Sequence, residues 1–85
     1  MLDIDELEEL EPDHIADARG SACPGPLLEA KKGVGAVPVG GVLEVRSNDK
    51  GTRKDIPLWS EKVGHEYLGM LESDGYDRLF VRRKK

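Results

Sequence analysis

Cysteine is almost absent from this chain of 85 residues, in which Cys23 is the only one. An intrachain disulfide therefore cannot form, which excludes the disulfide-stapled scaffolds of small secreted proteins. The chain also has only two histidines, His14 and His65. Together with one cysteine they are too few for a structural zinc site, which uses four protein ligands. We expect neither a metal site nor a cofactor.

Long apolar runs are missing as well. No stretch approaches the roughly 20 apolar residues that a membrane-spanning helix needs. The beginning of the chain, Met1–Glu6, lacks the basic residues and the apolar core of an export signal. The sequence therefore predicts a single soluble domain in the cytoplasm, without a membrane partner.

Charge of one sign is missing from the first 13 residues, which hold seven acidic residues and no basic one. The rest of the chain has 13 basic and 10 acidic residues, a charge of +3. Leu2, Ile4, Leu7 and Leu10 recur among the acids at near-helical spacing, but Pro12 follows and no base is available to pair with them. We interpret residues 1–13 as a flexible acidic arm and residues 14–85 as the folded domain. A segment that docks a partner or covers the domain is the alternative.

Beyond the arm, hydrophobic spacing alternates between strand-like and helix-like segments. A short strand at 14–18 precedes a helix that begins near Pro26, a residue suited to a first helical turn. In the next strand, 41–46, Leu43 and Val45 share one face and Glu44 and Arg46 the other, which predicts a half-buried strand.

The second half of the chain continues the pattern. Asp55 is placed to cap a helix with an apolar stripe of Ile56, Trp59 and Val63. Two strands, 66–72 and 78–82, follow and are joined by a tight turn at 73–76. The order is β-α-β-α-β-β, an α+β two-layer sandwich. It has a mixed four-stranded sheet with two helices on one face and the other face partly in water.

The most informative motif is Cys23-Pro24-Gly25-Pro26, directly before the first predicted helix. Unpaired backbone N–H groups and the helix dipole favour an anion at a helix start. A thiol there ionises more readily, and the thiolate is the nucleophile of sulfur chemistry. A small buried hydrophobic side chain is the alternative interpretation of Cys23.

This motif resembles the Cys-Pro-x-Pro signature of the TusA/SirA-like sulfur-carrier family. The resemblance extends over Ala16–Arg83 and includes Leu27-Leu28, Ala30-Lys31-Lys32, Gly41–Val45, Asp55-Ile56-Pro57, Trp59 and Gly64-His65. It implies that Cys23 accepts sulfane sulfur as a persulfide or thiosulfonate, so that the protein is a sulfurtransferase acting as a protein-to-protein relay.

The resemblance also implies partners. The donor would be a cysteine desulfurase or a rhodanese-like protein, and the acceptor a DsrE-like carrier or a tRNA-thiolation protein. The sulfur would serve tRNA thiolation or sulfur oxidation. A monomer without direct nucleic-acid contact is expected.

Several further residues are candidates for supporting roles. The residues expected to shape the turn at Cys23 are Asp17, Gly20, Pro24, Gly25 and Pro26. Asp17 would anchor the chain that leads to Cys23 through backbone N–H groups, with a merely solvated carboxylate as the alternative. A basic rim for partners would consist of Lys31, Lys32, Arg53 and Lys54. His65 is a candidate auxiliary group near the sulfur, with a structural hydrogen bond as the alternative.

One departure from the family and one rival function remain. Ser60 stands where some members have a second cysteine, which leaves Cys23 as the single carrier thiol. The rival is a nucleic-acid-binding or regulatory domain, suggested by the basic C-terminus Arg82–Lys85 and the four-stranded sheet. The charge of +3 is weak for that role, and the predicted strands lack a run of exposed aromatic residues for base stacking.

Overall fold

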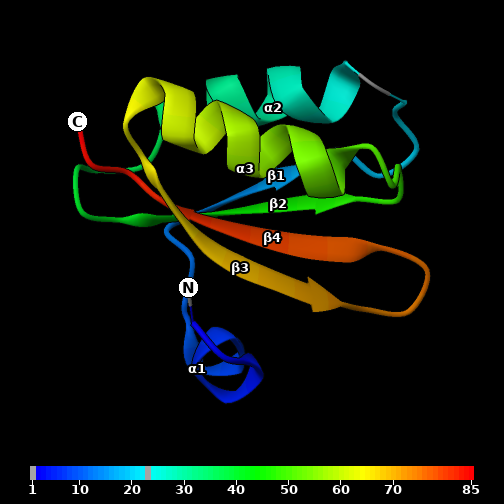
Figure 1. The fold of residues 1–85 in the computed structure, drawn as a ribbon, viewed down its shortest axis with the longest axis horizontal. Coiled ribbons are helices and arrows are strands. Elements are labelled where there is room, and N and C mark those ends of the chain that lie inside the picture. Colours follow the sequence, from blue (N-terminus) through cyan, green and yellow to red (C-terminus); the bar gives the residue numbers. More distant parts are fainter. Residues whose placement is uncertain (1, 23) are drawn as a thin grey trace.

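The computed structural model describes residues 2–22 and 24–85 (Figure 1). Its elements, in chain order, are α1 (Ile4–Glu9), β1 (His14–Asp17), α2 (Gly25–Val34), β2 (Val42–Ser47), α3 (Thr52–Val63), β3 (Glu66–Glu72) and β4 (Asp77–Arg82). Within these described ranges no helix is both long enough and apolar enough to cross a membrane. The same ranges contain no cluster of three or more residues suited to holding a metal ion.

The four strands form one mixed sheet in the order β1-β2-β4-β3. β1 runs parallel to β2, whereas β4 runs antiparallel to both of its neighbours. The turn between β3 and β4 is closed by a bond from the Ser73 amide to the Tyr76 carbonyl, 2.7 Å, with Gly75 at a positive φ of 82°. The predicted order β-α-β-α-β-β is confirmed from β1 onward, as is the mixed α+β sheet, and α1 is an additional helix before β1.

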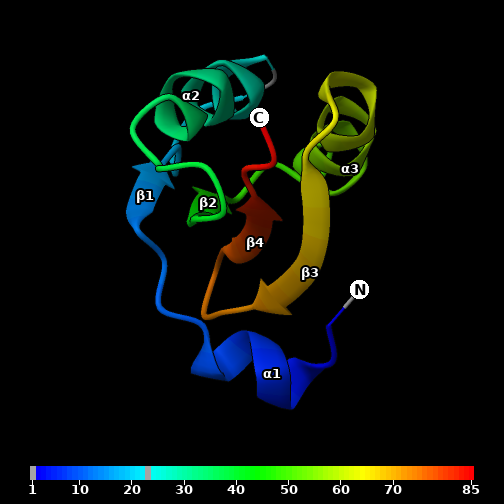
Figure 2. The ribbon, with the colours of Figure 1, turned by 90° about the vertical axis from the view of Figure 1, so that its left-hand side faces the viewer.

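Helices α2 and α3 lie side by side on one face of the sheet (Figure 2). The main core lies between the two layers and consists of Ala16, Ala30, Val37, Leu43, Val45, Ile56, Trp59, Leu79 and Val81. Leu43 and Val45 are fully buried there, as their strand pattern predicts.

Helix α3 begins at Thr52, three residues before the predicted cap. The prediction of Asp55 as N-cap is wrong because the buried hydroxyl of Thr52 pairs with that of Ser47 at 2.8 Å, which fixes the start of the helix next to the end of β2. Asp55 falls in the first turn instead. Val63 lies in the last turn and is 39% exposed, so it does not extend the buried stripe of Ile56 and Trp59.

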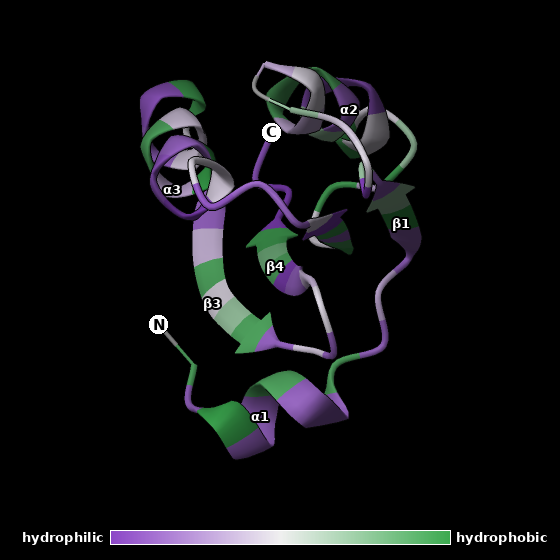
Figure 3. Ribbon diagram, turned by 90° about the vertical axis from the view of Figure 1, so that its right-hand side faces the viewer, coloured by the Kyte–Doolittle hydropathy of each residue, from purple (hydrophilic) through white to green (hydrophobic). Residues whose placement is uncertain are grey.

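The opposite face of the sheet carries α1 (Figures 1 and 2). The structure differs here from the expected flexible arm, and the segment lies where the covering alternative would place it. Asp3 caps the helix by accepting a bond from the Glu6 amide at 2.9 Å. Hydrophobic and hydrophilic residues alternate along the helix (Figure 3), and Leu7 is only 2% exposed. Leu7 belongs to a second apolar cluster with Val42, Leu68, Leu71 and Phe80.

A glycine in β3 makes room for this helix. Gly69 has a φ of 142° and lies at a register irregularity of the β3–β4 pairing. A β-carbon at this position would lie 2.9 Å from Cδ1 of Leu7, too close for a side chain. The Leu2 amide also donates to the Leu68 carbonyl at 2.8 Å, so the backbone before α1 is tied to the same strand.

The same face buries a charged residue that the strand pattern had assigned to a half-exposed position. Glu44 is 0% exposed and accepts bonds from Arg46 and Arg78, the latter at 3.0 Å. Burial raises the pKa of Glu44, but the hydrogen bonds from Arg78 and Arg46 outweigh it and hold that pKa below its usual value. The carboxylate is buried because two guanidinium groups satisfy it.

Candidate functional site

The candidate site is the end of the sheet where the parallel strands β1 and β2 finish and α2 begins. Cys23 lies outside the described residues, and the chain on both sides of it is described. Past β1, the Ala18 amide donates to the Arg46 carbonyl at 2.8 Å, so pairing with β2 continues for one more residue. A turn follows, in which the Ser21 amide donates to Ala18 at 3.1 Å and Gly20 takes a φ of 88°. Only glycine adopts that backbone conformation without strain.

The start of α2 follows from the two prolines of the motif. Pro24 occupies the position before the helix and Pro26 lies in its first turn, where a missing N–H removes no helical bond. The Gly25 amide donates to the Ala22 carbonyl at 2.8 Å. A β-carbon on Gly25 would lie 2.8 Å from the β-carbon of Ser21, so glycine is required by close packing against that serine.

Asp17 lies at the end of β1, before the turn. Its carboxylate accepts bonds from the Arg19 backbone amide at 3.1 Å and from the Arg19 guanidinium at 2.9 and 2.7 Å. The side-chain hydrogen bond from Arg19 is the main reason that the pKa of Asp17 falls from 3.8 to about 2. Arg19 in turn lies over the Tyr76 ring, 4.9 Å from its centroid. Sequence reasoning missed Arg19, although a base two residues after an acid was a visible signal.

Asn48 was also missed, and it connects two loops. Its side-chain carbonyl accepts a bond from the Gly20 amide at 2.9 Å, across 28 residues of sequence. Gly20, Ser21, Ala22, Asn48 and Asp49 line an open hollow of about 420 Å³ next to the motif. Nothing in the sequence separated Asn48 from the other polar residues of its loop.

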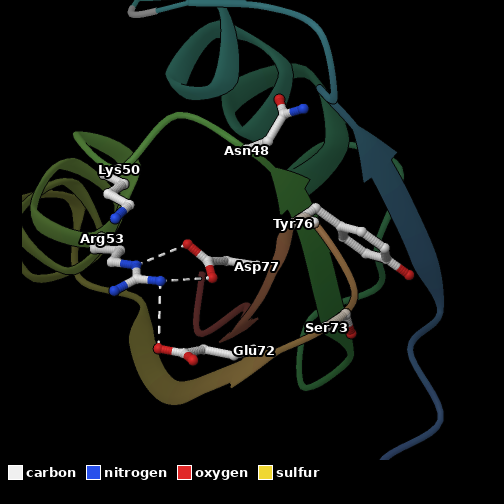
Figure 4. A pocket seen from close by; sticks show the side chains of 8 residues that line it. Asn48, Lys50, Arg53, Glu72, Ser73, Tyr76 and Asp77 are labelled. Carbon is white, nitrogen blue, oxygen red and sulfur yellow. Dashed lines mark hydrogen bonds and ion pairs between the residues drawn. The ribbon is translucent and has the colours of Figure 1, made fainter.

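Arg53, predicted for a basic rim, lies at this end of the sheet but is already paired. Its guanidinium donates to both carboxylate oxygens of Asp77 at 2.8 and 3.0 Å and lies 3.3 Å from Glu72 (Figure 4). These groups line a second hollow of about 260 Å³, together with Asn48, Lys50, Ser73, Gly75 and Tyr76. Arg53 therefore joins α3 to the two strands of the hairpin.

The other predicted rim residues are spread over the helices. Lys54 is exposed in the first turns of α3, close to Arg53 in the chain. Lys31 and Lys32 lie in the last turn of α2, away from Pro24, and Lys32 is 3.5 Å from Glu29. Lys31 also lines a hollow together with Asp55 of α3, the residue that follows Lys54. The basic rim stays a prediction.

His65 lies between the end of α3 and the start of β3. The start of β3 and the start of α2 are at opposite ends of the sheet (Figure 1). The Nδ1 atom of His65 accepts a bond from the Lys84 amide at 3.1 Å, and its ring makes an edge contact with Trp59 at 5.9 Å. Burial lowers the pKa of His65, and the nearby charges of Arg83 and Lys85 lower it further. The bond from Lys84 is of the kind expected if His65 has a structural role and is not an auxiliary group near the sulfur.

Ser60 is fully buried in α3. Its hydroxyl donates to the Ile56 carbonyl one turn earlier, at 2.7 Å. The hydroxyl is therefore satisfied within its own helix.

Comparisons with known proteins show which family this chain resembles. The family model described as "Sulfurtransferase TusA" matches residues 14–83. A "Putative sulfur carrier protein" of Archaeoglobus fulgidus is 46% identical over 71 residues, which cover 84% of this chain and 97% of the relative. The "Sulfur carrier protein TusA" of Pseudomonas entomophila is 38% identical over 78 residues, 92% of this chain and 98% of the relative.

A solved structure shows the same fold. The crystal structure of a SirA-like protein from Desulfitobacterium hafniense aligns with a TM-score of 0.73 and 27% identity, covering 85% of this chain and 99% of that one. The family match spans the whole sheet together with α2 and α3, and it excludes α1. The chain belongs to the TusA family of sulfurtransferases.

Proposed function

We propose that this protein is a sulfur carrier in which Cys23 bears the transferred sulfur. The observation that carries the proposal is the position of Pro24, Gly25 and Pro26 at the beginning of α2 in a chain of the TusA family. The residue before Pro24 is the single cysteine of the sequence. Ser60 offers no second thiol, so loading and discharge both involve Cys23.

The transfer is an exchange at sulfur. The Cys23 thiolate attacks the outer sulfur of a donor persulfide, a new S–S bond forms, and the donor's S–S bond breaks. The donor leaves as a thiolate, and Cys23 now carries the persulfide, with no net oxidation. An acceptor thiolate then attacks the outer sulfur, which returns Cys23 to its thiolate form.

Membership of the family supports a donor protein and an acceptor protein as partners. The donor is a cysteine desulfurase or a rhodanese-like protein, and the acceptor is a DsrE-like carrier or a tRNA-thiolation protein. Delivery leads to tRNA thiolation or to sulfur oxidation. The protein acts in the cytoplasm as a monomer, a sulfurtransferase that relays sulfur between proteins.

Intact-mass measurement tests the role of Cys23. Wild type treated with glutathione persulfide should gain the mass of one sulfur atom and lose it on reduction, whereas Cys23→Ser should gain none. Both proteins should have similar unfolding midpoints. Absence of loading in wild type, or equal loading of Cys23→Ser, would contradict the proposal.

The reactivity of the thiol gives a second test. The position of the motif at a helix start should lower the pKa of the Cys23 thiol below its usual value of about 8.5. The rate of alkylation by iodoacetamide, measured against pH, gives this value directly. A midpoint at or above the usual value would show that the helix start does not activate the thiol.

A further inference from the structure

Among the described residues, hydrogen bonds hold the loop between β1 and α2 at both of its ends. At its beginning, the Asp17–Arg19 pair and the bond from Ala18 to β2 fix the backbone. At its end, the helix bond from Leu28 to Pro24 fixes the backbone again. Asn48, from the loop after β2, accepts a hydrogen bond from the Gly20 amide through its side-chain oxygen. Among the hydrogen bonds of the described residues, it is the one from another part of the chain that lies nearest to the motif.

The loop that carries Asn48 is itself well fixed. The Ser47 and Thr52 hydroxyls, both buried, are 2.8 Å apart, and the Asp49 amide donates to the Ser47 hydroxyl at 3.1 Å. The Gly51 amide donates to the Asp49 carboxylate at 3.0 Å. The residues on both sides of Asn48 are therefore held by hydrogen bonds, so the backbone of Asn48 is fixed and its side-chain oxygen has a defined position.

We propose that Asn48 is a positioning residue for sulfur transfer, acting through the Gly20 amide three residues before Cys23. This inference rests on the proposed role of Cys23 as the carrier. Gly20 has a left-handed backbone within the turn that the bond from the Ser21 amide to the Ala18 carbonyl closes. That bond shapes the turn, and the bond from Asn48 fixes the turn relative to the loop after β2, which sets the direction of the chain that enters the motif. Attack at sulfur requires a defined approach of the thiolate, and misplacement by about 1 Å can slow an enzymatic reaction by about a hundredfold.

Three variants test this role. Asn48→Ala removes the acceptor, and Asn48→Asp keeps an oxygen at the same distance along the side chain. Ser73→Ala is the matched control, because Ser73 lines the same hollow as Asn48 but makes no hydrogen bond to Gly20. Each variant is loaded with glutathione persulfide across a pH series, and the limiting rate at high pH is taken. Using that limit removes the effect of the added charge in Asn48→Asp on ionisation of the thiol.

The expected result is a limiting rate about tenfold lower in Asn48→Ala. Asn48→Asp and Ser73→Ala should stay near the wild-type rate. Amide hydrogen exchange should show Gly20 protected in wild type and in Asn48→Asp and exchanging faster in Asn48→Ala. Thermal unfolding confirms that each variant is folded, and a purely structural role would change that midpoint without changing the limiting rate.

Two results would overturn the inference. One is a wild-type limiting rate in folded Asn48→Ala, and the other is a rate in Asn48→Asp as low as in Asn48→Ala. Failure of wild type to load refutes the carrier role of Cys23, and the exchange of the Gly20 amide then still decides whether Asn48 holds the loop.

Discussion

Replacing Leu7 by alanine should lower the free energy of unfolding by about 2 kcal/mol, because Leu7 is the main anchor of α1. Its side chain is 2% exposed and packs with Leu68, Leu71 and Phe80. Substitutions of this kind in closed cores cost roughly 2–5 kcal/mol. The lower end applies here, because a hollow of about 450 Å³ beside Leu7 and Gly69 admits water to the space that the alanine would leave.

Urea denaturation followed by circular dichroism measures this loss. Ile4→Ala is the matched control, since Ile4 is in the same helix and is 64% exposed. It should change the free energy of unfolding by less than about 0.5 kcal/mol. Amide exchange in α1 should become faster in Leu7→Ala and stay unchanged in Ile4→Ala.

A double-mutant cycle with Gly69 sharpens the test. Gly69→Ala adds a β-carbon only 2.9 Å from Leu7 Cδ1, in a backbone conformation that disfavours side chains. Part of its cost should disappear when Leu7 is already alanine, which gives a coupling of about 1 kcal/mol. If Leu7→Ala behaves like Ile4→Ala and shows no coupling with Gly69→Ala, α1 does not pack on the sheet in solution.

Three other substitutions have expected outcomes. Gly25→Ala should slow sulfur loading because its β-carbon meets that of Ser21, and adding Ser21→Gly should restore the rate; no rescue would contradict the packing argument. Glu44→Gln should cost about 2 kcal/mol of unfolding free energy at neutral pH, which denaturation against pH would measure. The folded-state pKa of Glu44 is lowered, so its stabilisation is present above the ordinary glutamate pKa of about 4.3 and is lost as pH falls through the folded value; a cost independent of pH would refute this. His65→Ala should leave loading unchanged and lower stability by about 1 kcal/mol, since its contact is with Lys84 at the far end; slower loading would assign it an auxiliary role.

The order of strands and helices could be predicted because each element has its own hydrophobic period. The alternation of Leu43 and Val45 and the spacing of Ile56 and Trp59 reflect local backbone geometry, which is all that a pattern records. The start of α3 could not be predicted in the same way. It depends on Thr52 meeting Ser47, a contact between two buried hydroxyls that no propensity describes.

Glu44 illustrates the same limit on a sheet face. An acid that alternates with apolar residues predicts a solvent-facing position. Its burial depends on Arg78, which the strand register places opposite Arg46, and that register is unknown before the sheet is assembled. The apolar spacing of the first segment was visible too, but the space for Leu7 depends on Gly69, far along the chain.

In the candidate site, too, residues that are adjacent in the chain could be predicted, whereas contacts between distant residues could not. The motif predicted Cys23 and the prolines as site residues through resemblance, because those residues are adjacent in sequence. Asn48 reaches Gly20 across 28 residues, so only the folded chain brings them together.

The position of α1 gives the molecule an electric polarity that its net charge of −4 conceals. The acidic segment lies beneath the sheet, while the layer above it, α2 and α3, holds five bases and three acids (Figure 2). A protein whose negative and positive charges lie on opposite sides rotates in the electric field of a charged partner before the two surfaces touch. With an acidic partner, the surface of α2 and α3 would face that partner. Added salt shortens the reach of that field to about 8 Å at physiological ionic strength, which weakens the steering while leaving the contacts in the complex largely intact. The segment outside the family fold thus gives the protein a preferred direction of approach.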